Sequence, residues 1–426
     1  MINRNFFYIY LILYFSFLVG FYLNEDFAGG ALVDYMHHIR VMNIMQKDII
    51  GTFLNYEEVA FVHSPIYILY FLLLNNTFGV VGAKLINMHL ILLIPFFIYL
   101  TLNLNFDLKK NRFLILLPAI FFVSPYFRAG AFTIDDNVLA LTLFTISIYF
   151  FFRHEKSNEL KFIFLNTLFL SLAAYFRPIY CLFGFYFFIS YYFKLGLNKN
   201  FFYYIFFNII LSSPALYYTI ILGINDWFQN FYSRVNILTC ASITLSIIFF
   251  YSLPFLFLNI LGIQKNKIKL KLFLFNKKVL LLSLIFFFSL FFFFDYTAGS
   301  AQLVTYSGGI FFKLSILLFK NSYFFYLISS ISFYFISIIF IKFSKKKDLI
   351  LDFTLLLILI FMGVHGRIYH EIYDPLLYIL FFLLIKNNFY KSVIQNMKFI
   401  PFMFLLLFSL SFFILSIIKT VYLDSL

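Results

Sequence analysis

Long apolar runs, interrupted by short polar segments, follow one another along most of the 426-residue chain. Because about 20 apolar residues in a helix cross the hydrocarbon core of a bilayer, each run predicts a membrane-spanning helix. We therefore expect an all-α fold, a polytopic transmembrane bundle of about 11–13 spans that forms one domain over residues 1–426. The predicted spans are 6–23, 85–102, 113–127, 136–152, 161–177, 178–193, 201–222, 236–262, 279–294, 322–341, 350–363, 375–385 and 399–418.

One long segment outside the predicted spans, 24–84, follows the first span. Within it, the apolar piece HSPIYILYFLLL (63–74) is too short to span comfortably. We expect it to form a helix on, or dipping into, the outer membrane surface. The alternative is that this piece is a true second span, which would place every later loop on the opposite side of the membrane. A second outer excursion, 295–321, carries another short apolar piece at 308–319.

Composition supports a membrane protein, since 63% of residues are hydrophobic and 12% are charged, with a mean hydropathy of +0.94. A soluble chain would carry about a quarter charged residues. The first apolar run lacks a small-residue cleavage site, so we interpret it as a retained span. The 70 Phe residues fit the codon bias of an A/T-rich genome better than an aromatic binding cage. Cys181 and Cys240 fall in apolar stretches and form no disulfide or metal-ligand pattern.

The distribution of charge predicts the orientation. Of the 32 Lys and Arg residues, 22 fall in short segments that face the cytoplasm if the N-terminus is inside, which is the positive-inside pattern. Thirteen of the 18 acidic residues fall on the opposite side. The net charge of +14 therefore does not indicate nucleic-acid binding. We expect a multi-pass protein of the bacterial inner membrane with a cytoplasmic N-terminus and an active site on the periplasmic face.

The first outer loop carries the carboxylates Glu25, Asp26 and Asp34 and the imidazoles of His37 and His38. On a helix, Asp34 shares a face with both histidines. Glu25 and Asp26 also have an ordinary interpretation as solvated loop ends. A carboxylate at membrane depth is costly, which favours a functional role for Asp34.

A second acidic loop holds Asp135 and Asp136 at the start of an apolar run. An Asp at this position often caps a helix by accepting hydrogen bonds from the first backbone N–H groups. One of the two carboxylates can cap while the other faces a site, and the sequence does not distinguish them.

Three arginines, Arg128, Arg177 and Arg367, lie at the predicted outer boundary. The guanidinium fork binds phosphate well, although arginines near a membrane also extend toward lipid headgroups. The outer histidines match no spacing typical of metal ligands.

Together these groups suit glycosyl transfer from a lipid phosphate. A carboxylate takes a proton from the acceptor hydroxyl, and fixed cations stabilise the departing phosphate. Apolar grooves between spans would hold the isoprenoid tail.

These residues make the chain similar to the GT-C superfamily of polyprenyl-phosphate-sugar-dependent glycosyltransferases, which includes protein O-mannosyltransferases, aminoarabinose transferases and dolichyl-phosphate-glucose glucosyltransferases. The motifs, in order over nearly the whole chain, are VDYMHHI (33–39), HSPIYILYFLL (63–73), DDNVLALTLF (135–144), FRPIY (176–180) and RIYHEIYDPLL (367–377).

The resemblance implies that Asp34 is the general base, with Asp26 as the reserve candidate. It implies that Asp135 and Asp136 form the second acidic loop. The donor phosphate would be bound by Arg177, Arg367, Tyr369 and Arg128, and acceptor or loop contacts would come from His37, His63 and Tyr67. The implied partners are a polyprenyl-phosphate-linked sugar, membrane lipids, and a glycolipid, glycan or protein acceptor. The sequence neither requires nor excludes a divalent metal.

The main alternative from another class is a flippase for lipid-linked oligosaccharides or another polytopic transporter. Such a protein would place charges along the centres of its spans, whereas here they gather at the outer boundary. An O-antigen ligase or polymerase would typically carry its large outer loop late in the chain, and here the large loop comes first.

Overall fold

The computed structural model describes residues 4–27, 31–59, 64–106, 111–221, 236–260, 276–294, 308–363 and 370–420. Within these ranges the chain forms helices joined by short turns and contains no β-strand. The expected all-α fold is confirmed. The chain divides into two compact units, Met1–Phe228 together with Leu405–Leu426 (unit 1) and Gln229–Phe404 (unit 2).

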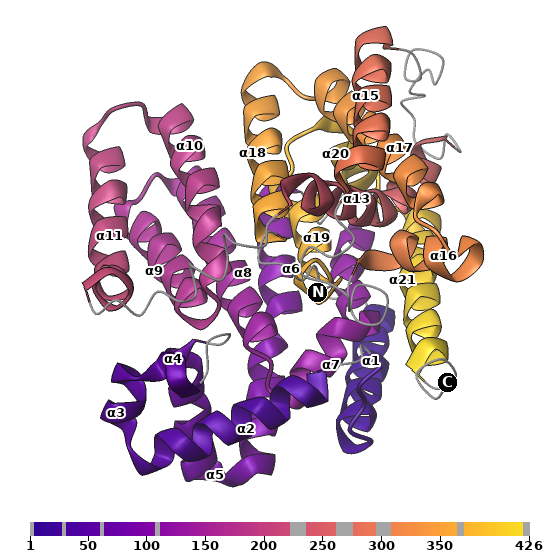
Figure 1. Ribbon diagram of the computed structural model, residues 1–426. Coiled ribbons are helices and arrows are strands. Elements are labelled where there is room, and N and C mark those ends of the chain that lie inside the picture. The colour runs from indigo at the N-terminus through magenta and orange to yellow at the C-terminus, as the bar shows by residue number, and fades with distance from the viewer. Residues whose placement is uncertain are drawn as a thin grey trace. The chain divides into compact units, whose positions relative to one another are not determined.

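Unit 1 contains most of the candidate site residues. Its elements are α1 (Arg4–Tyr22), α2 (Ala31–Lys47), α3 (Ile49–Leu54), α4 (Tyr56–Val59), α5 (Pro65–Ile91), α6 (Leu93–Asn105), η1 (Arg112–Val123), α7 (Pro125–Thr133), α8 (Asp136–Ser157), α9 (Leu160–Phe176), η2 (Pro178–Leu182), α10 (Phe183–Leu195), α11 (Lys199–Leu216), η3 (Tyr217–Ile221) and the later part of α21 (Phe399–Ile418) (Figure 1).

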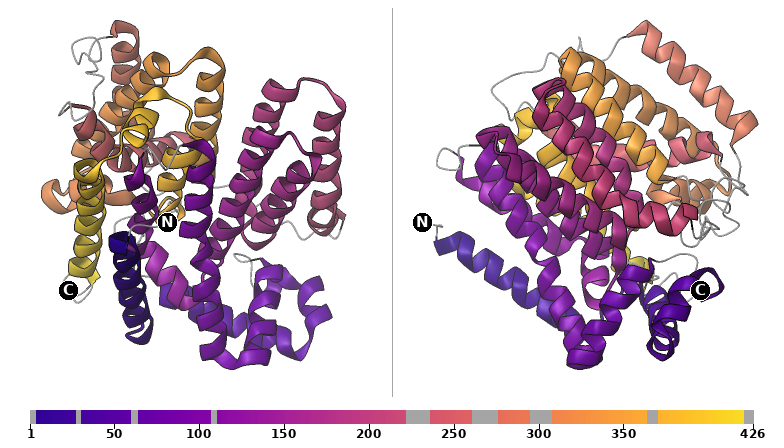
Figure 2. Two further views of the ribbon diagram at one scale, coloured as in Figure 1. Left: turned by 180° about the vertical axis from the view of Figure 1, so that it is seen from behind. Right: turned by 90° about the vertical axis from the view of Figure 1, so that its left-hand side faces the viewer.

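Unit 2 is built around α13. Its elements are α13 (Ile237–Ile260), α15 (Lys277–Phe293), α16 (Gly309–Phe319), α17 (Tyr323–Phe343), α18 (Lys346–Met362), η4 (His370–Ile372), α19 (Leu376–Ile379), η5 (Leu380–Leu384) and α20 (Asn388–Gln395). Helix α17 contacts both α15 and α18, and the three run side by side (Figure 2). Buried hydroxyl pairs join the elements, such as Thr244 with Tyr373, whose oxygens lie 2.8 Å apart.

Six helices in the described ranges are long and apolar enough to cross a membrane, and eight if each of two bent helix pairs is one span. A helical segment lies at each of the thirteen predicted spans, but several are shorter than a full span, such as Phe6–Tyr22 and Leu160–Phe176. Some long helices also expose their apolar side chains: Phe292 of α15 is 80% exposed. Such surfaces suit contact with lipid. The architecture is compatible with a multi-pass membrane protein.

Helix α5 joins two segments that the sequence predicts separately. The expected surface helix at 63–74 continues, from Pro65, through Gly79 into the expected span at 85–102. The helix is interrupted at Gly79, whose backbone has φ +68° and ψ 171°. This conformation lies in the region that glycine adopts without steric cost. The glycine therefore separates the first part of α5 from the part that leads into α6.

Helices α2, α3 and α4 gather with the first part of α5 at one end of the longer helices of unit 1 (Figures 1 and 2). Asp48 begins α3 by accepting a hydrogen bond from the Gly51 N–H at 2.8 Å. The buried face of α2 packs on α5 through apolar side chains that include Val41, Met42 and Phe71. This layer places the first outer loop beside the start of α8.

The last helix completes unit 1. From Leu405 onward, α21 belongs to this unit. Phe412 packs on Tyr126 of α7 with ring centroids 6.3 Å apart. The Ser416 and Thr420 hydroxyls both donate hydrogen bonds to the Phe27 carbonyl, the second at 3.2 Å. Segments separated by almost 400 residues therefore share one core.

Candidate functional site

In unit 1, an ion pair joins the start of α8 to the end of α9. The Arg177 Nη1 donates to Asp136 Oδ1 at 2.7 Å. Asp136 begins α8, and Arg177 follows the last residue of α9 because Pro178 disfavours a further helical residue. The Asp136 side chain is 1% exposed and the Arg177 side chain 16% exposed. The carboxylate is therefore shielded, while the arginine side chain is partly exposed.

The two carboxylates of the second acidic loop have different roles. Asp135 is the N-cap of α8, with its Oδ1 accepting from the Asn137 N–H at 2.7 Å. Asp136 faces Arg177 instead. Asp135 is thus the residue that caps α8, and Asp136 is the residue that pairs with Arg177.

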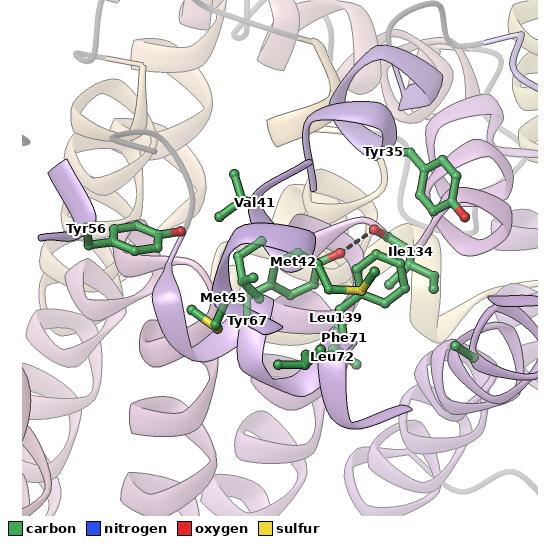
Figure 3. Close-up of a cluster of buried hydrophobic side chains, with 12 residues drawn as sticks. Tyr35, Val41, Met42, Met45, Tyr56, Tyr67, Phe71, Leu72, Ile134 and Leu139 are labelled. Atoms are coloured by element: carbon green, nitrogen blue, oxygen red, sulfur yellow. Dashed lines mark hydrogen bonds between the residues drawn. The ribbon is translucent and has the colours of Figure 1, made fainter. Parts of the chain in front are cut away.

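Tyr67 connects the first outer loop to the second. Its hydroxyl donates to the carbonyl of Ile134, the residue before the acidic doublet (Figure 3). The same hydroxyl lies 3.5 Å from His38 Nδ1 on α2. It also interacts electrostatically with Asp136, Asp135 and Asp34. Both acidic loops therefore lie around one buried tyrosine.

The Arg177 segment is held from two sides. The Ser64 hydroxyl, at the start of α5, donates to the Tyr175 carbonyl. On the other side of Arg177, the Tyr180 hydroxyl donates to Asn137 Oδ1 at 3.4 Å. These contacts fix the arginine relative to both α5 and α8.

Asp34 lies in the first turn of α2 and is exposed, and His37 is half-buried. The neighbouring Tyr35 is buried, with Lys84 Nζ 4.2 Å from its ring centroid. The position of Asp34 is fixed by the buried face of α2, while its carboxylate stays accessible.

Asp26 has a local structural role. Its Oδ2 accepts from the Leu32 N–H at 3.0 Å and so satisfies a free backbone donor in the first turn of α2. The carboxylate that the sequence ranks as the reserve base therefore helps to begin the helix that carries Asp34.

Arg128 is enclosed by protein. Its Nε and Nη2 donate to the two carboxylate oxygens of Glu25, both at 2.6 Å. Its other N–H groups donate to the Ser16 hydroxyl, the Ser16 carbonyl and the Phe122 carbonyl. All five guanidinium N–H groups are therefore donated within the chain, and the side chains of Arg128 and Glu25 are only 5% and 7% exposed. This arrangement does not favour the phosphate-binding role predicted for Arg128.

Three predicted site residues, His63, Arg367 and Tyr369, lie outside the described residues. His370, beside the last two, is buried and its Nε2 lies 3.0 Å from the Tyr251 hydroxyl. Within the described ranges, no group of three or more His, Cys, Asp or Glu residues is placed to hold a metal ion.

Sequence reasoning missed Tyr56. Its side chain is buried and interacts electrostatically with Tyr218 and Asp136, and its hydroxyl finds no hydrogen-bond partner in the part of the chain that the structure describes. Burial raises the pKa of Tyr56, and Tyr218 and Asp136 raise that pKa further, so the hydroxyl stays protonated at neutral pH. With 24% aromatic residues in the chain, nothing in the sequence distinguishes this tyrosine from the others.

Comparisons of the chain with models of known protein families, with curated proteins and with solved structures give no match.

Proposed function

We propose that the protein is a membrane glycosyltransferase that moves a sugar from a polyprenyl-phosphate carrier to a hydroxyl acceptor. One observation carries the proposal: the Asp136–Arg177 pair lies beside the helices that hold Asp34 and Tyr67, so residues from distant segments form one polar centre. Carboxylates and an accessible arginine are the groups that this transfer needs.

In this proposal Arg177 binds the donor phosphate. One Nη1–H is donated to Asp136, and the guanidinium fork can donate in parallel to an anion from its accessible side. As the bond between the sugar and the phosphate breaks, negative charge grows on the phosphate. A fixed cation at that position lowers the energy of the transition state. The pairing with Asp136 keeps the guanidinium in place before the donor arrives.

Asp34 is the proposed general base. Its carboxylate is exposed at the start of α2, so an acceptor hydroxyl can approach within hydrogen-bond distance. Removal of the hydroxyl proton makes the acceptor oxygen a better nucleophile as the sugar leaves its carrier. Asp26 is less suited, because one of its oxygens already accepts from the Leu32 N–H.

The location belongs to the same proposal. The charge pattern of the sequence favours a cytoplasmic N-terminus, and with it a site on the periplasmic face of a bacterial inner membrane. Apolar side chains exposed on the long helices of unit 1, such as Phe202 and Ile209 of α11, would lie against lipid and against the isoprenoid chain of the carrier.

The test compares wild type, Asp34→Asn and Glu58→Gln in purified, lipid-reconstituted protein. Glu58 is exposed in the same outer segment and is the matched control. Labelled polyprenyl-phosphate sugars are supplied with membrane extract as acceptor, and loss of label from the carrier is followed. We expect wild type and Glu58→Gln to consume one donor and Asp34→Asn to be slower by about 10²-fold or more.

Equal rates for wild type and Asp34→Asn would remove Asp34 from the role of base. If wild-type protein consumes no donor but moves the intact carrier across a vesicle bilayer, the transferase proposal fails and the flippase alternative replaces it.

A further inference from the structure

A buried carboxylate holds two turns of unit 2 together. Asp352 of α18 is 0% exposed. Its Oδ2 accepts from the Ser344 hydroxyl at 2.8 Å, and its Oδ1 accepts from the Lys386 N–H at 2.7 Å. Ser344 lies in the turn between α17 and α18, whereas Lys386 lies in the turn between η5 and α20. The carboxylate therefore fixes these two turns beside each other.

Aromatic packing supports the same arrangement. Phe343, the last residue of α17, lies against Phe389 of α20 with ring centroids 5.8 Å apart. Phe389 also packs on Phe335, with ring centroids 6.0 Å apart. Helix α20 meets the preceding helical segment, His370–Leu384, at an angle of 86°. It therefore turns sharply and packs on the last turns of α17.

The two turns bring basic side chains together. Residues 342–352 and 386–391 contain six lysines and two aspartates. Asp352 accepts hydrogen bonds inside the protein, and Asp348 is half-buried. The lysines, which we call the lysine cluster, are the exposed Lys342, Lys345, Lys346 and Lys347 and the half-buried Lys386 and Lys391. The surface of the two turns is therefore strongly basic.

The turn between α8 and α9 in unit 1 has a different balance of charge, although the charge pattern favours the cytoplasmic side for it as well. Its exposed lysines, Lys156 and Lys161, are accompanied by Glu155 and Glu159. The Lys161 Nζ lies 2.6 Å from Glu159 Oε2. Orientation in the membrane requires only a basic excess in such turns, so it does not explain the concentration of lysines in unit 2.

Apolar side chains continue from the lysine cluster along the adjoining helices. Ile341 of α17 is 46% exposed and Ile350 of α18 is 42% exposed. Each lies within a few residues of exposed lysines. A lysine extends its apolar stem along such a surface and places its ammonium group at the level of lipid phosphates. Basic groups next to exposed apolar groups complement a molecule with an anionic head and an acyl tail.

We propose that the lysine cluster binds the anionic headgroups of phospholipids on the cytoplasmic side of the membrane. Several lysines next to a membrane-spanning helix are attracted by the negative surface of that leaflet, and each adds to the affinity. The buried Asp352 is a positioning residue, because it joins the two turns that supply the lysines. This inference goes beyond the proposed sugar transfer and does not depend on it.

The test measures the binding of phosphatidylglycerol and phosphatidylcholine to the full-length protein in detergent, by titration with fluorescent lipid. Lys345→Gln/Lys346→Gln removes two exposed lysines of the cluster. Lys156→Gln/Lys161→Gln is the matched control, since it removes two exposed lysines from the turn between α8 and α9. We expect wild type and the control to prefer phosphatidylglycerol. The cluster variant should bind this lipid about tenfold or more weakly, with phosphatidylcholine binding unchanged.

A second variant, Lys386→Gln/Lys391→Gln, tests the contribution of the other turn, and we expect phosphatidylglycerol binding to weaken about three- to tenfold. Unchanged binding by either cluster variant would overturn the proposal. An equal loss in the Lys156→Gln/Lys161→Gln control would also overturn it, by showing a general attraction to exposed lysines. Glycerol phosphate, which lacks acyl chains, should bind far more weakly than the lipid. If it bound as tightly, the occupant would be a soluble anion and the proposal would fail.

Discussion

The described residues of unit 1 include two arginine–carboxylate pairs that differ in their surroundings. Around Arg128 and Glu25, every guanidinium N–H is donated to protein, and both side chains are almost completely buried. In the Arg177–Asp136 pair, by contrast, the arginine side chain is 16% exposed and the carboxylate side chain 1% exposed. The Arg128–Glu25 pair has all its guanidinium donors satisfied within the chain, whereas the Arg177–Asp136 pair is the one that we propose binds the donor phosphate.

The surroundings of the Arg128–Glu25 pair indicate a structural role. It joins the end of α1 to α7, and the Arg128 guanidinium lies 5.3 Å from the Phe413 ring. Helix α1 approaches so closely that a Cβ on Gly20 would lie 2.5 Å from Arg128 Nη2 and from Glu25 Oε2. The same ionic chemistry is therefore enclosed by protein at Arg128 and partly exposed at Arg177.

The largest effect on stability should come from breaking the pair of Arg128 and Glu25. Arg128→Ala leaves the Glu25 carboxylate buried without its cation, and we expect a loss of about 3–5 kcal/mol in unfolding free energy. Thermal or denaturant unfolding of the purified protein measures it. The double variant Glu25→Leu/Arg128→Leu is the control, since removal of both charges should recover part of the loss. A single variant as stable as wild type would show that the pair contributes nothing.

A matched arginine-to-lysine substitution sharpens the comparison. Arg177→Lys keeps the charge beside Asp136 but loses the planar fork, so we expect transfer to fall by about 10²-fold with stability within about 1 kcal/mol of wild type. Arg128→Lys should instead lower the melting temperature, because the lysine has three N–H donors in place of the five of arginine. Initial rates and melting temperatures of both variants provide the measurement. If both changed stability alone, the distinction between the two pairs would be lost.

The acidic doublet should show a smaller effect. Asp135→Ala removes the N-cap of α8, and we expect a loss of about 1 kcal/mol. Asp135→Ser retains a capping oxygen and should restore the stability. Donor binding by both variants should match wild type, because the neighbouring Asp136 makes the contact with Arg177. Weaker donor binding by Asp135→Ser would place Asp135 in the site as well.

The smallest effect is expected at the exposed pair of Lys161 and Glu159, whose atoms approach to 2.6 Å while their side chains remain 64% and 45% exposed. Solvent screens such a pair and both side chains lose freedom to form it. Lys161→Ala should therefore leave the melting temperature and the transfer rate unchanged. A clear destabilisation would show that burial does not decide the value of an ion pair in this protein.

The helical fold could be predicted from the sequence because long apolar runs directly indicate helices. The start of α8 at the acidic doublet and the end of α9 before Pro178 follow from local rules for caps and prolines. The continuation of α5 through Gly79 did not follow, since an apolar run bent at a glycine resembles two separate helices. Hydropathy predicted the position of each helix but not the number of full spans, because several apolar helices are shorter than a full span.

The site was less accessible, because its decisive contacts join residues far apart in the chain. Arg128 and Arg177 both precede or follow apolar runs, and only the fold assigns Glu25 to one and Asp136 to the other. Local patterns carry no information on such pairings in a single sequence. Tyr56 was missed for a related reason, since what distinguishes it is a buried hydroxyl without a partner among the described residues, and not its residue type.

Because α21 contributes to unit 1, this unit depends on residues that are made late in synthesis. A ribosome makes α1 and α7 long before it makes Phe412, Phe413 and Ser416, and the whole of 229–404 is made in between. Until those last residues arrive, the ring that covers Arg128 is missing and the Phe27 carbonyl lacks its two hydroxyl donors. Unit 1 therefore completes its packing only after the intervening chain of unit 2 has been made.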